Sequence, residues 1–198
     1  HFLWADLQNF ESYKHGPARG DIPGFIDMMV SQRRGDGWSD PQTFQLSEPY
    51  FAESGADISY DGSLDGVWYT SNKQAQQPYH DDIYVNGVRL PSPVNTPTNE
   101  ADPHFFKGEL FFWRDEKEKD HEIWMAKNLG GDVQKWTDPV KLAAPINSPA
   151  ADMQPFLRSN GQLYFSSSRA GRLEIYVSQR LGESRWSEPQ KVIGIFPS

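Results

Sequence analysis

The sequence predicts an all-β protein built from repeated copies of one unit. Short apolar runs bounded by Gly, Asn, Asp and Pro indicate strands and turns, and 15 prolines and 16 glycines interrupt the 198 residues. No long apolar helix pattern accompanies these runs. In addition, several landmarks return in the same order along the chain. A repeat of this kind determines the architecture of a protein.

The clearest copy of the repeat lies between residues 151 and 189. It contains, in order, Ala-Asp-Met-Gln-Pro at 151–155, Ser-Asn-Gly at 159–161, Leu-Tyr-Phe-Ser at 163–166, Glu-Ile-Tyr at 174–176 and Trp-Ser-Glu-Pro at 186–189. The acidic residue of the Glu-Ile-Tyr triplet returns at spacings of 55, 40 and 52 residues, as Asp27, Asp82, Glu122 and Glu174. The Ala-Asp pair returns at spacings of 45 and 50 residues. The chain therefore contains four copies.

Each copy predicts four short strands. The first follows Ala-Asp, a glycine turn leads to the aromatic second strand, the third begins at the acidic triplet, and the fourth begins near Trp-Ser/Thr-Asp/Glu-Pro. Four antiparallel strands in about 40–50 residues are typical of one blade of a β-propeller, whereas the turns of a β-solenoid are much shorter. We therefore expect a small β-propeller with four blades of four-stranded antiparallel sheet, in a single domain over residues 1–198.

The predicted blades cover about residues 1–50, 51–98, 99–148 and 149–198. The first blade begins late, at Phe2-Leu3-Trp4, and therefore lacks its inner strand. The chain also begins with His1 in place of an initiator methionine, which indicates processing or trimming. We expect the native polypeptide to extend upstream of His1, or the propeller to close in an alternative way.

The run from Asp152 to Val177 resembles the WD-like repeat of TolB-type propellers, in which Asp, Pro, a Gly turn, an aromatic strand, Ser-x-Arg and Asp/Glu-Ile-Tyr follow one another. Pro-Ile-Asn-Ser at 145–148, together with the closing Trp-Ser-Glu-Pro, is similar to the subgroup found in bacterial envelope proteins. The third copy also matches well, but the second has Leu-Pro-Ser-Pro at 90–93 in place of the closing tryptophan motif. The resemblance implies a non-catalytic binding module outside the cytoplasm, in the periplasm, at the cell surface or secreted.

The composition excludes several classes of function. A net charge of −8 argues against a nucleic-acid partner, because phosphates require a basic surface. The absence of cysteine excludes disulfides and thiolate chemistry. No run approaches the roughly 18–20 apolar residues of a membrane span. No nucleophile elbow, phosphate loop or zinc helix motif occurs, so we expect no catalytic residue and no cofactor.

Three aspartates of the Ala-Asp pairs are candidate ligand-binding residues. The alignment of the copies places Asp57, Asp102 and Asp152 together at the mouth of the central channel, with His104 two residues further along its strand. Converging carboxylates suit a cation or a basic group. The alternative is that each aspartate caps a turn within its own blade, and repetition in every blade favours this structural role. His104 is not repeated and is a separate candidate.

Two other repeated features are interpreted as structural. The acidic residue before the third strand occurs in all four copies, which favours a hydrogen bond that each blade needs. The closing tryptophan is expected to pack between blades, with a sugar-stacking platform as the alternative.

Features that break the repeat are better candidates for recognition. The first blade carries a long insertion from about residue 6 to 25, with Tyr13, His15 and Arg19, and the second blade carries His80 in the corresponding loop. We expect a protein, peptide or glycan to bind the face that carries this insertion and the channel mouth.

Two alternatives to a binding module remain open. A carbohydrate-active, glycan-cleaving enzyme would need two carboxylates about 5–9.5 Å apart, one of them with a raised pKa. Metal binding would use His80 and His121 with a nearby carboxylate, or copper held by the amine and imidazole of His1.

Overall fold

The computed structural model describes residues 2–7, 26–48, 51–73, 80–115 and 121–193, and every regular element in these ranges is a β-strand. The predicted all-β class is therefore confirmed. Within the same ranges, no helix has the length and apolar character that crossing a membrane would require.

The strands form four main antiparallel sheets, each from one continuous part of the chain. The first sheet has the order β1-β2-β5, with β1 (Phe2–Leu7), β2 (Ile26–Ser31) and β5 (Gln42–Thr43). A separate hairpin of β3 (Arg33–Arg34) and β4 (Gly37–Trp38) follows β2. The first sheet therefore has three strands in the described part of the chain.

The other three sheets are four-stranded, as the repeat predicts. The second consists of β6 (Glu53–Ser59), β7 (Gly66–Ser71), β8 (Asp82–Val85) and β9 (Val88–Arg89). The third consists of β10 (Glu100–Phe106), β11 (Glu109–Asp115), β12 (His121–Lys127) and β13 (Val140–Lys141). The fourth consists of β14 (Asp152–Leu157), β15 (Gln162–Ser167), β16 (Glu174–Gln179) and β17 (Gln190–Lys191). In each sheet the strands follow their order in the sequence.

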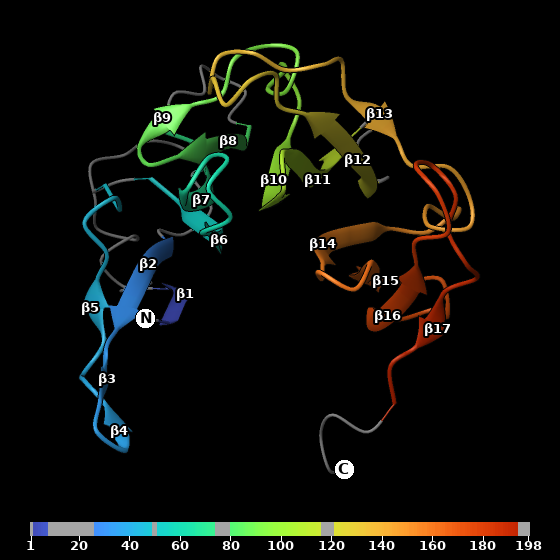
Figure 1. Ribbon diagram of the computed structural model, residues 1–198. Helices are drawn as coiled ribbons and strands as arrows, with labels where there is room; N and C mark the ends of the chain where they lie inside the picture. The colour runs from blue at the N-terminus through green and yellow to red at the C-terminus, as the bar shows by residue number, and fades with distance from the viewer. Residues whose placement is uncertain (1, 8–25, 49–50, 74–79, 116–120, 194–198) are drawn as a thin grey trace.

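The four sheets lie side by side in an open arc (Figure 1). Strands β6, β10 and β14 lie on the inner side of the arc, and β9, β13 and β17 lie on its outer side (Figure 1). The first sheet (blue) and the last sheet (red) stand at opposite ends and do not meet. The described residues form no closed ring, so the predicted closed four-bladed propeller is not confirmed.

Apolar side chains fill the space between neighbouring sheets. One cluster joins Trp68 and Ile83 of the second sheet to Phe105, Phe112 and Trp136 of the third. Similar clusters join the third sheet to the fourth and the first to the second. Because the side chains of a strand alternate between its two faces, each inner sheet packs on both sides.

A buried asparagine fixes the connection between consecutive sheets. The Oδ1 atom of Asn147 accepts the amide of Ile123 at 2.8 Å, and its Nδ2 donates to the carbonyls of Ile123 and Leu142. Asn95 makes the same three hydrogen bonds one sheet earlier. A buried amide side chain with hydrogen bonds to all of these partners costs little free energy to bury. It fixes the connecting segment against the third strand of the sheet.

Three of the four acidic residues before the third strands make a contact within their own sheet, in agreement with the structural interpretation of the repeat. They bind basic residues on or beside the neighbouring outer strand, in the pairs Asp82–Arg89, Glu122–Lys141 and Glu174–Lys191. Each pair links the third strand of a sheet to its fourth.

Candidate functional site

The inner strands β6, β10 and β14 share one irregularity. In each strand the pairing register shifts by a β-bulge, and the bulged residue has a positive φ: Gly55, Asp102 and Gln154. Proline follows the bulge in two of the three strands, as Pro103 and Pro155. Proline lacks an amide hydrogen, so a bulge is the position in a strand that tolerates it. Each bulge shifts the pairing register, and so determines which face of the sheet the following side chains, Asp57, His104 and Phe156, lie on.

The strand registers correct the predicted alignment of the three aspartates. Counted from the bulge, Asp102 occupies the bulged position itself, Asp57 lies two residues after it, and Asp152 lies two residues before it. They therefore do not form a ring of equivalent carboxylates. The Ala-Asp pair misleads because its copies fall at three different positions of the strand.

The true repeated carboxylate lies two residues before the bulge, at Glu53, Glu100 and Asp152. All three side chains are fully buried. The Arg169 guanidinium donates to Asp152 Oδ1 at 2.7 Å and to the carbonyls of Pro145 and Ile146. Asp152 is therefore part of the joint between sheets, and it does not line the groove described below.

Arg114 makes the same joint one sheet earlier. It bonds Glu100 at 2.8 Å and the carbonyls of Pro93 and Val94. Among the described residues no arginine bonds to Glu53, which accepts from the Ser71 hydroxyl at 3.0 Å, while Lys73 binds Glu48. Burial raises the pKa of Glu53 to about 7, against the opposing effect of the Ser71 hydrogen bond.

Two neighbouring hollows run along the inner strands, and we call their shared surface the inner groove. The smaller, of about 230 Å³, is lined by residues 55–57, 102–104 and 154–156. The larger, of about 400 Å³, continues along the same three strands to Asp61, Phe106 and Ser159. Three residues line both hollows: Asp57, His104 and Phe156. They occupy the same position after the bulge, one from each sheet.

His104 connects all three inner strands. Its Nδ1 lies 2.9 Å from Asp57 Oδ2, and its Nε2 lies 2.9 Å from the carbonyl oxygen of Leu157. Because a carbonyl only accepts, Nε2 carries a hydrogen, and Nδ1 shares a proton with the Asp57 carboxylate. The imidazole ring also lies 4.5 Å from the ring of Phe156, which is 48% exposed. The groove thus presents a carboxylate, an imidazole and an aromatic face next to one another.

Asp102 lines the smaller hollow from the bulged position. It accepts from Trp113 Nε1 at 2.7 Å, and its amide donates to Thr70 Oγ1. Burial raises the pKa of this carboxyl, although the Trp113 hydrogen bond opposes the shift. The backbone of Gly55 lies so close that a Cβ there would be 2.5 Å from Asp102 Oδ1.

The two predicted metal histidines take other partners. His121 Nδ1 lies 2.5 Å from Asp115 Oδ1, and its ring lies 4.4 Å from that of Trp113. His80 lies 3.8 Å from Asp82, whose carboxylate holds Arg89. Within the described ranges, no group of three or more histidine and acidic side chains is placed to hold a metal ion.

The candidate residues of the first-blade insertion, Tyr13, His15 and Arg19, lie outside the described residues, as does His1. Of the other candidates, Asp57, Asp102 and His104 come together in the groove, whereas His80 and Asp152 do not line it. Sequence reasoning missed Phe156. The prolines at 103 and 155 mark the bulges and were the signal that could have aligned it with His104.

The fold and the groove define an all-β protein of repeated antiparallel sheets with a polar and aromatic inner surface. No protein-family model matches the chain, and no curated protein matches it. Among solved structures it is similar to a puromycin-hydrolyzing peptidase of Mycobacterium tuberculosis, with a TM-score of 0.48 and 17% sequence identity. The similarity covers 86% of this chain and 29% of the peptidase chain, so this chain spans less than a third of that protein's length. A likeness of this strength indicates nothing about activity.

Proposed function

We propose that the chain is a non-catalytic binding module whose sheets are blades of a TolB-type propeller, and that its ligand lies in the inner groove. One observation carries this proposal: Asp57, His104 and Phe156 occupy one position of three repeated strands but differ chemically. A structural role would be filled by similar residues in every sheet, as it is at the buried carboxylates. Of the three, Phe156 and the partly exposed Asp57 face the groove, and the buried His104 holds Asp57 in place.

The chemistry of the groove favours a peptide or glycan segment. Asp57 and the polar backbone of the bulges offer hydrogen bonds, and the half-exposed Phe156 ring offers an apolar face. Sugars and peptides combine both kinds of surface, and ligand sites usually pair a few polar groups with aromatic walls. The TolB-type resemblance of residues 152–177 supports a location outside the cytoplasm.

Glycan and peptide arrays would identify the ligand, and titration calorimetry would then compare variants. We expect Phe156→Ala to weaken binding by about tenfold or more, because it removes an aromatic wall of the groove. Val140→Ala is the matched control, since Val140 is an exposed apolar residue on the outer strand β13. Equal affinity of both variants would refute this placement of the ligand.

A second candidate is a glycan-cleaving enzyme, and one observation favours it. Asp102, with a pKa raised by burial, lines the same hollow as Asp57. Such a pair can divide the roles of general acid and base. Turnover of an array glycan that is lost in Asp102→Asn would support the enzyme, whereas retention of a glycan without cleavage supports the binding module.

A further inference from the structure

The joints that Arg169 and Arg114 form share a further feature, an aromatic seat for the cation. The Arg169 guanidinium lies 5.0 Å from the ring centroids of both Phe165 and Tyr176, which are paired across β15 and β16. Arg114 lies 4.8 Å from the ring centroid of Trp124, over the corresponding aromatic pair of β11 and β12. An aromatic face attracts a cation at such distances. The seat therefore holds each arginine where it reaches a buried carboxylate.

Lys73 occupies the corresponding seat in the second sheet. Its Nζ lies 4.6 Å from the ring centroid of Tyr84 and 5.8 Å from that of Tyr69, and these two residues are paired across β8 and β7. The amide of Lys73 donates to the Ser71 hydroxyl at 3.2 Å, and the amide of Arg169 donates at the same distance to the serine two positions before it. Lys73 is therefore the counterpart of Arg169, with an ammonium in place of a guanidinium.

Lys73 differs from Arg169 in the carboxylate that it binds. Its Nζ donates to Glu48 Oε1 at 2.8 Å, and the Glu48 side chain is 51% exposed. The buried carboxyl of the same joint, that of Glu53, accepts from the Ser71 hydroxyl and the Glu48 backbone amide, and no cation among the described residues bonds to it. The joint between the first and second sheets, which we call the first joint, thus contains two carboxyls and one ammonium, and the ammonium binds the exposed carboxyl.

Several elements bring titratable side chains near Glu53. They are Asp27 of β2, Glu48 of the connecting segment, Tyr69 of β7 and Lys73. Asp6 of β1 stands opposite Asp27 in the strand register. Burial is the largest influence on the Glu53 carboxyl and raises its pKa to about 7, the negative charge of Asp27 adds to this rise, and the Lys73 ammonium opposes it. Glu53 therefore changes its charge near neutral pH, and Lys73 is the one basic side chain of this group.

The Lys73 side chain reaches Glu53 by the route that Arg169 takes to its carboxylate. The Ser71 hydroxyl lies 3.0 Å from Glu53 Oε1 and 3.2 Å from the amide of Lys73, so the carboxyl lies beside the start of the lysine side chain. In the fourth sheet Arg169 bonds Asp152 at 2.7 Å from the same starting position. Lysine is shorter than arginine, but glutamate is one methylene longer than aspartate, so the two pairs span a similar distance.

We propose that Lys73 exchanges Glu48 for Glu53 when Glu53 loses its proton, so that the first joint contains a pH-dependent ion-pair switch. In acid the Glu53 carboxyl is neutral, and the ammonium stays with the exposed Glu48 carboxylate. When Glu53 ionises, a buried charge without a cation is costly, whereas an exposed carboxylate loses little by giving up its partner to water. The ammonium therefore moves to Glu53 and keeps its place over the two tyrosine rings.

The exchange changes which part of the chain the ammonium holds. Glu48 belongs to the segment that connects the first sheet to the second, whereas Glu53 is the first residue of β6. In acid Lys73 ties the end of β7 to the connecting segment, and at higher pH it ties the same end to the inner strand. The arginines of the other two joints do not exchange, because each already binds its buried carboxylate and a guanidinium keeps its charge throughout.

A pH titration followed by NMR of the side-chain carbons tests the exchange directly. We expect the Glu53 carboxyl carbon to titrate near neutral pH. The Glu48 carboxyl carbon and Lys73 Cε should show a step at the same pH, because the ammonium leaves one carboxylate for the other. Glu53→Gln identifies the shared step, which is lost in this variant. A Glu53 titration that neither Glu48 nor Lys73 follows overturns the proposal.

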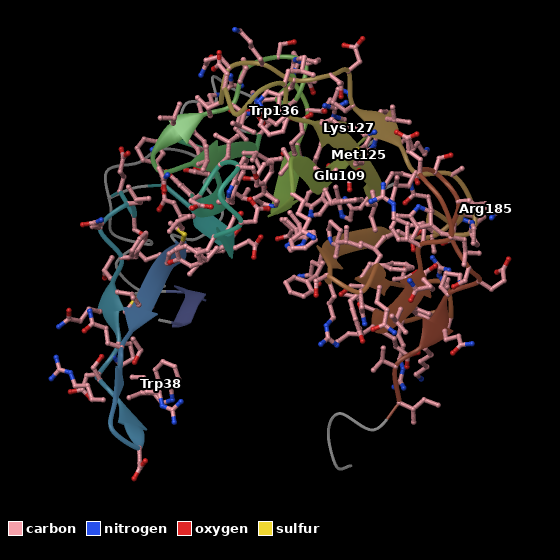
Figure 2. All side chains as sticks on the ribbon, in the orientation of Figure 1. Trp38, Glu109, Met125, Lys127, Trp136 and Arg185 are labelled. Atoms are coloured by element: carbon pink, nitrogen blue, oxygen red, sulfur yellow. The ribbon has the colours of Figure 1, made fainter. Side chains whose placement is uncertain are left out.

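Two substitutions fix the ammonium or its substitute on Glu53. Lys73→Arg supplies the guanidinium of the other joints and should lower the pKa of Glu53 by about 1–3 pH units, because the cation then stays beside the carboxylate. Glu48→Gln removes the competing carboxylate and should lower the pKa of Glu53 by a smaller amount. Lys127→Met is the matched control: Lys127 pairs with the exposed Glu183 and lies on the third sheet, away from the first joint (Figure 2).

The Glu48→Gln change lies at an exposed side chain, so it decides the question if circular dichroism shows Lys73→Arg to be unfolded. In both variants the shared step at Glu48 or Lys73 should disappear, whereas the control should keep it at the wild-type pH. A Glu53 pKa that is the same in wild type and Glu48→Gln contradicts the exchange, because the two carboxylates would then not compete for one ammonium.

Discussion

His104 Nδ1 lies 2.9 Å from Asp57 Oδ2 and joins the inner strands of two neighbouring sheets. The same ring reaches the carbonyl of Leu157 in a third sheet. This one side chain therefore couples the groove to the packing of the sheets around it, and its contribution can be measured as stability as well as binding.

A double-mutant cycle measures the coupling between these two residues. We expect Asp57→Asn, His104→Ala and the double variant to give an interaction free energy of about 1–2 kcal/mol in urea unfolding, because the pair is largely buried. The exposed pair Asp132–Lys135, at 3.3 Å, is the control and should give a much smaller interaction free energy, because water screens exposed charges. If the free-energy changes of the two single variants add up to that of the double variant, the two side chains are neighbours without being energetically coupled.

Arg169→Ala should be among the most destabilising substitutions in the chain. It leaves the fully buried Asp152 carboxylate without its guanidinium and frees the carbonyls of Pro145 and Ile146. Breaking a buried pair from one side costs about 3–5 kcal/mol. Arg172→Ala, in which an exposed arginine loses its bond to Glu174, should leave the stability close to that of the wild type when both are unfolded in the same denaturant titration.

Glu53 should make stability fall as the pH rises from about 4.5 to about 7. Its pKa is about 7 in the folded chain and 4.5 in the ordinary, exposed state. Between these values the folded state holds a proton that the unfolded state has lost, so the free energy of unfolding decreases with rising pH.

The difference between the wild-type and Glu53→Gln stability curves isolates this effect from other buried carboxyls such as Asp81, whose pKa burial raises to about 6. A wild-type stability that parallels the variant throughout this pH window would show that Glu53 is ionised at pH 6.

Gly55→Ala should destabilise the groove through one contact. The new Cβ would lie 2.5 Å from Asp102 Oδ1, at a φ of +59°. Gly62→Ala separates the cost of the backbone conformation from the cost of the steric contact. Gly62 also has a positive φ, of +81°, but has open space around it. We expect both variants to lose about 1 kcal/mol from the backbone and Gly55→Ala to lose about 1–2 kcal/mol more. Equal losses would mean that Asp102 moves aside freely.

The class of fold and the four-stranded sheets could be predicted from the sequence because turns and aromatic runs recur with local signals. The register within the inner strands could not be predicted in the same way. The Ala-Asp pairs suggested one alignment, but the bulges at Gly55, Asp102 and Gln154 set another, and a bulge depends on pairing with the neighbouring strand.

The candidate site was therefore predicted in part. Asp57 and His104 were expected near the channel, but their contact crosses two sheets and 47 positions of sequence, and no local pattern encodes it. Asp152 was expected beside them, and instead it is buried with Arg169, because two carboxylates of different strands can look alike in sequence while facing different partners.

The joint formed by Asn147, Arg169 and the Pro145–Ile146 carbonyls has a consequence for how such a chain can evolve. Its parts come from the end of one copy and the start of the next, and the same parts recur at Asn95 and Arg114. A duplicated copy inserted at either of these two joints thus arrives with matching partners on both sides. Gene duplication can change the number of sheets without inventing a new interface, and each added copy brings one more groove position that is free to diverge.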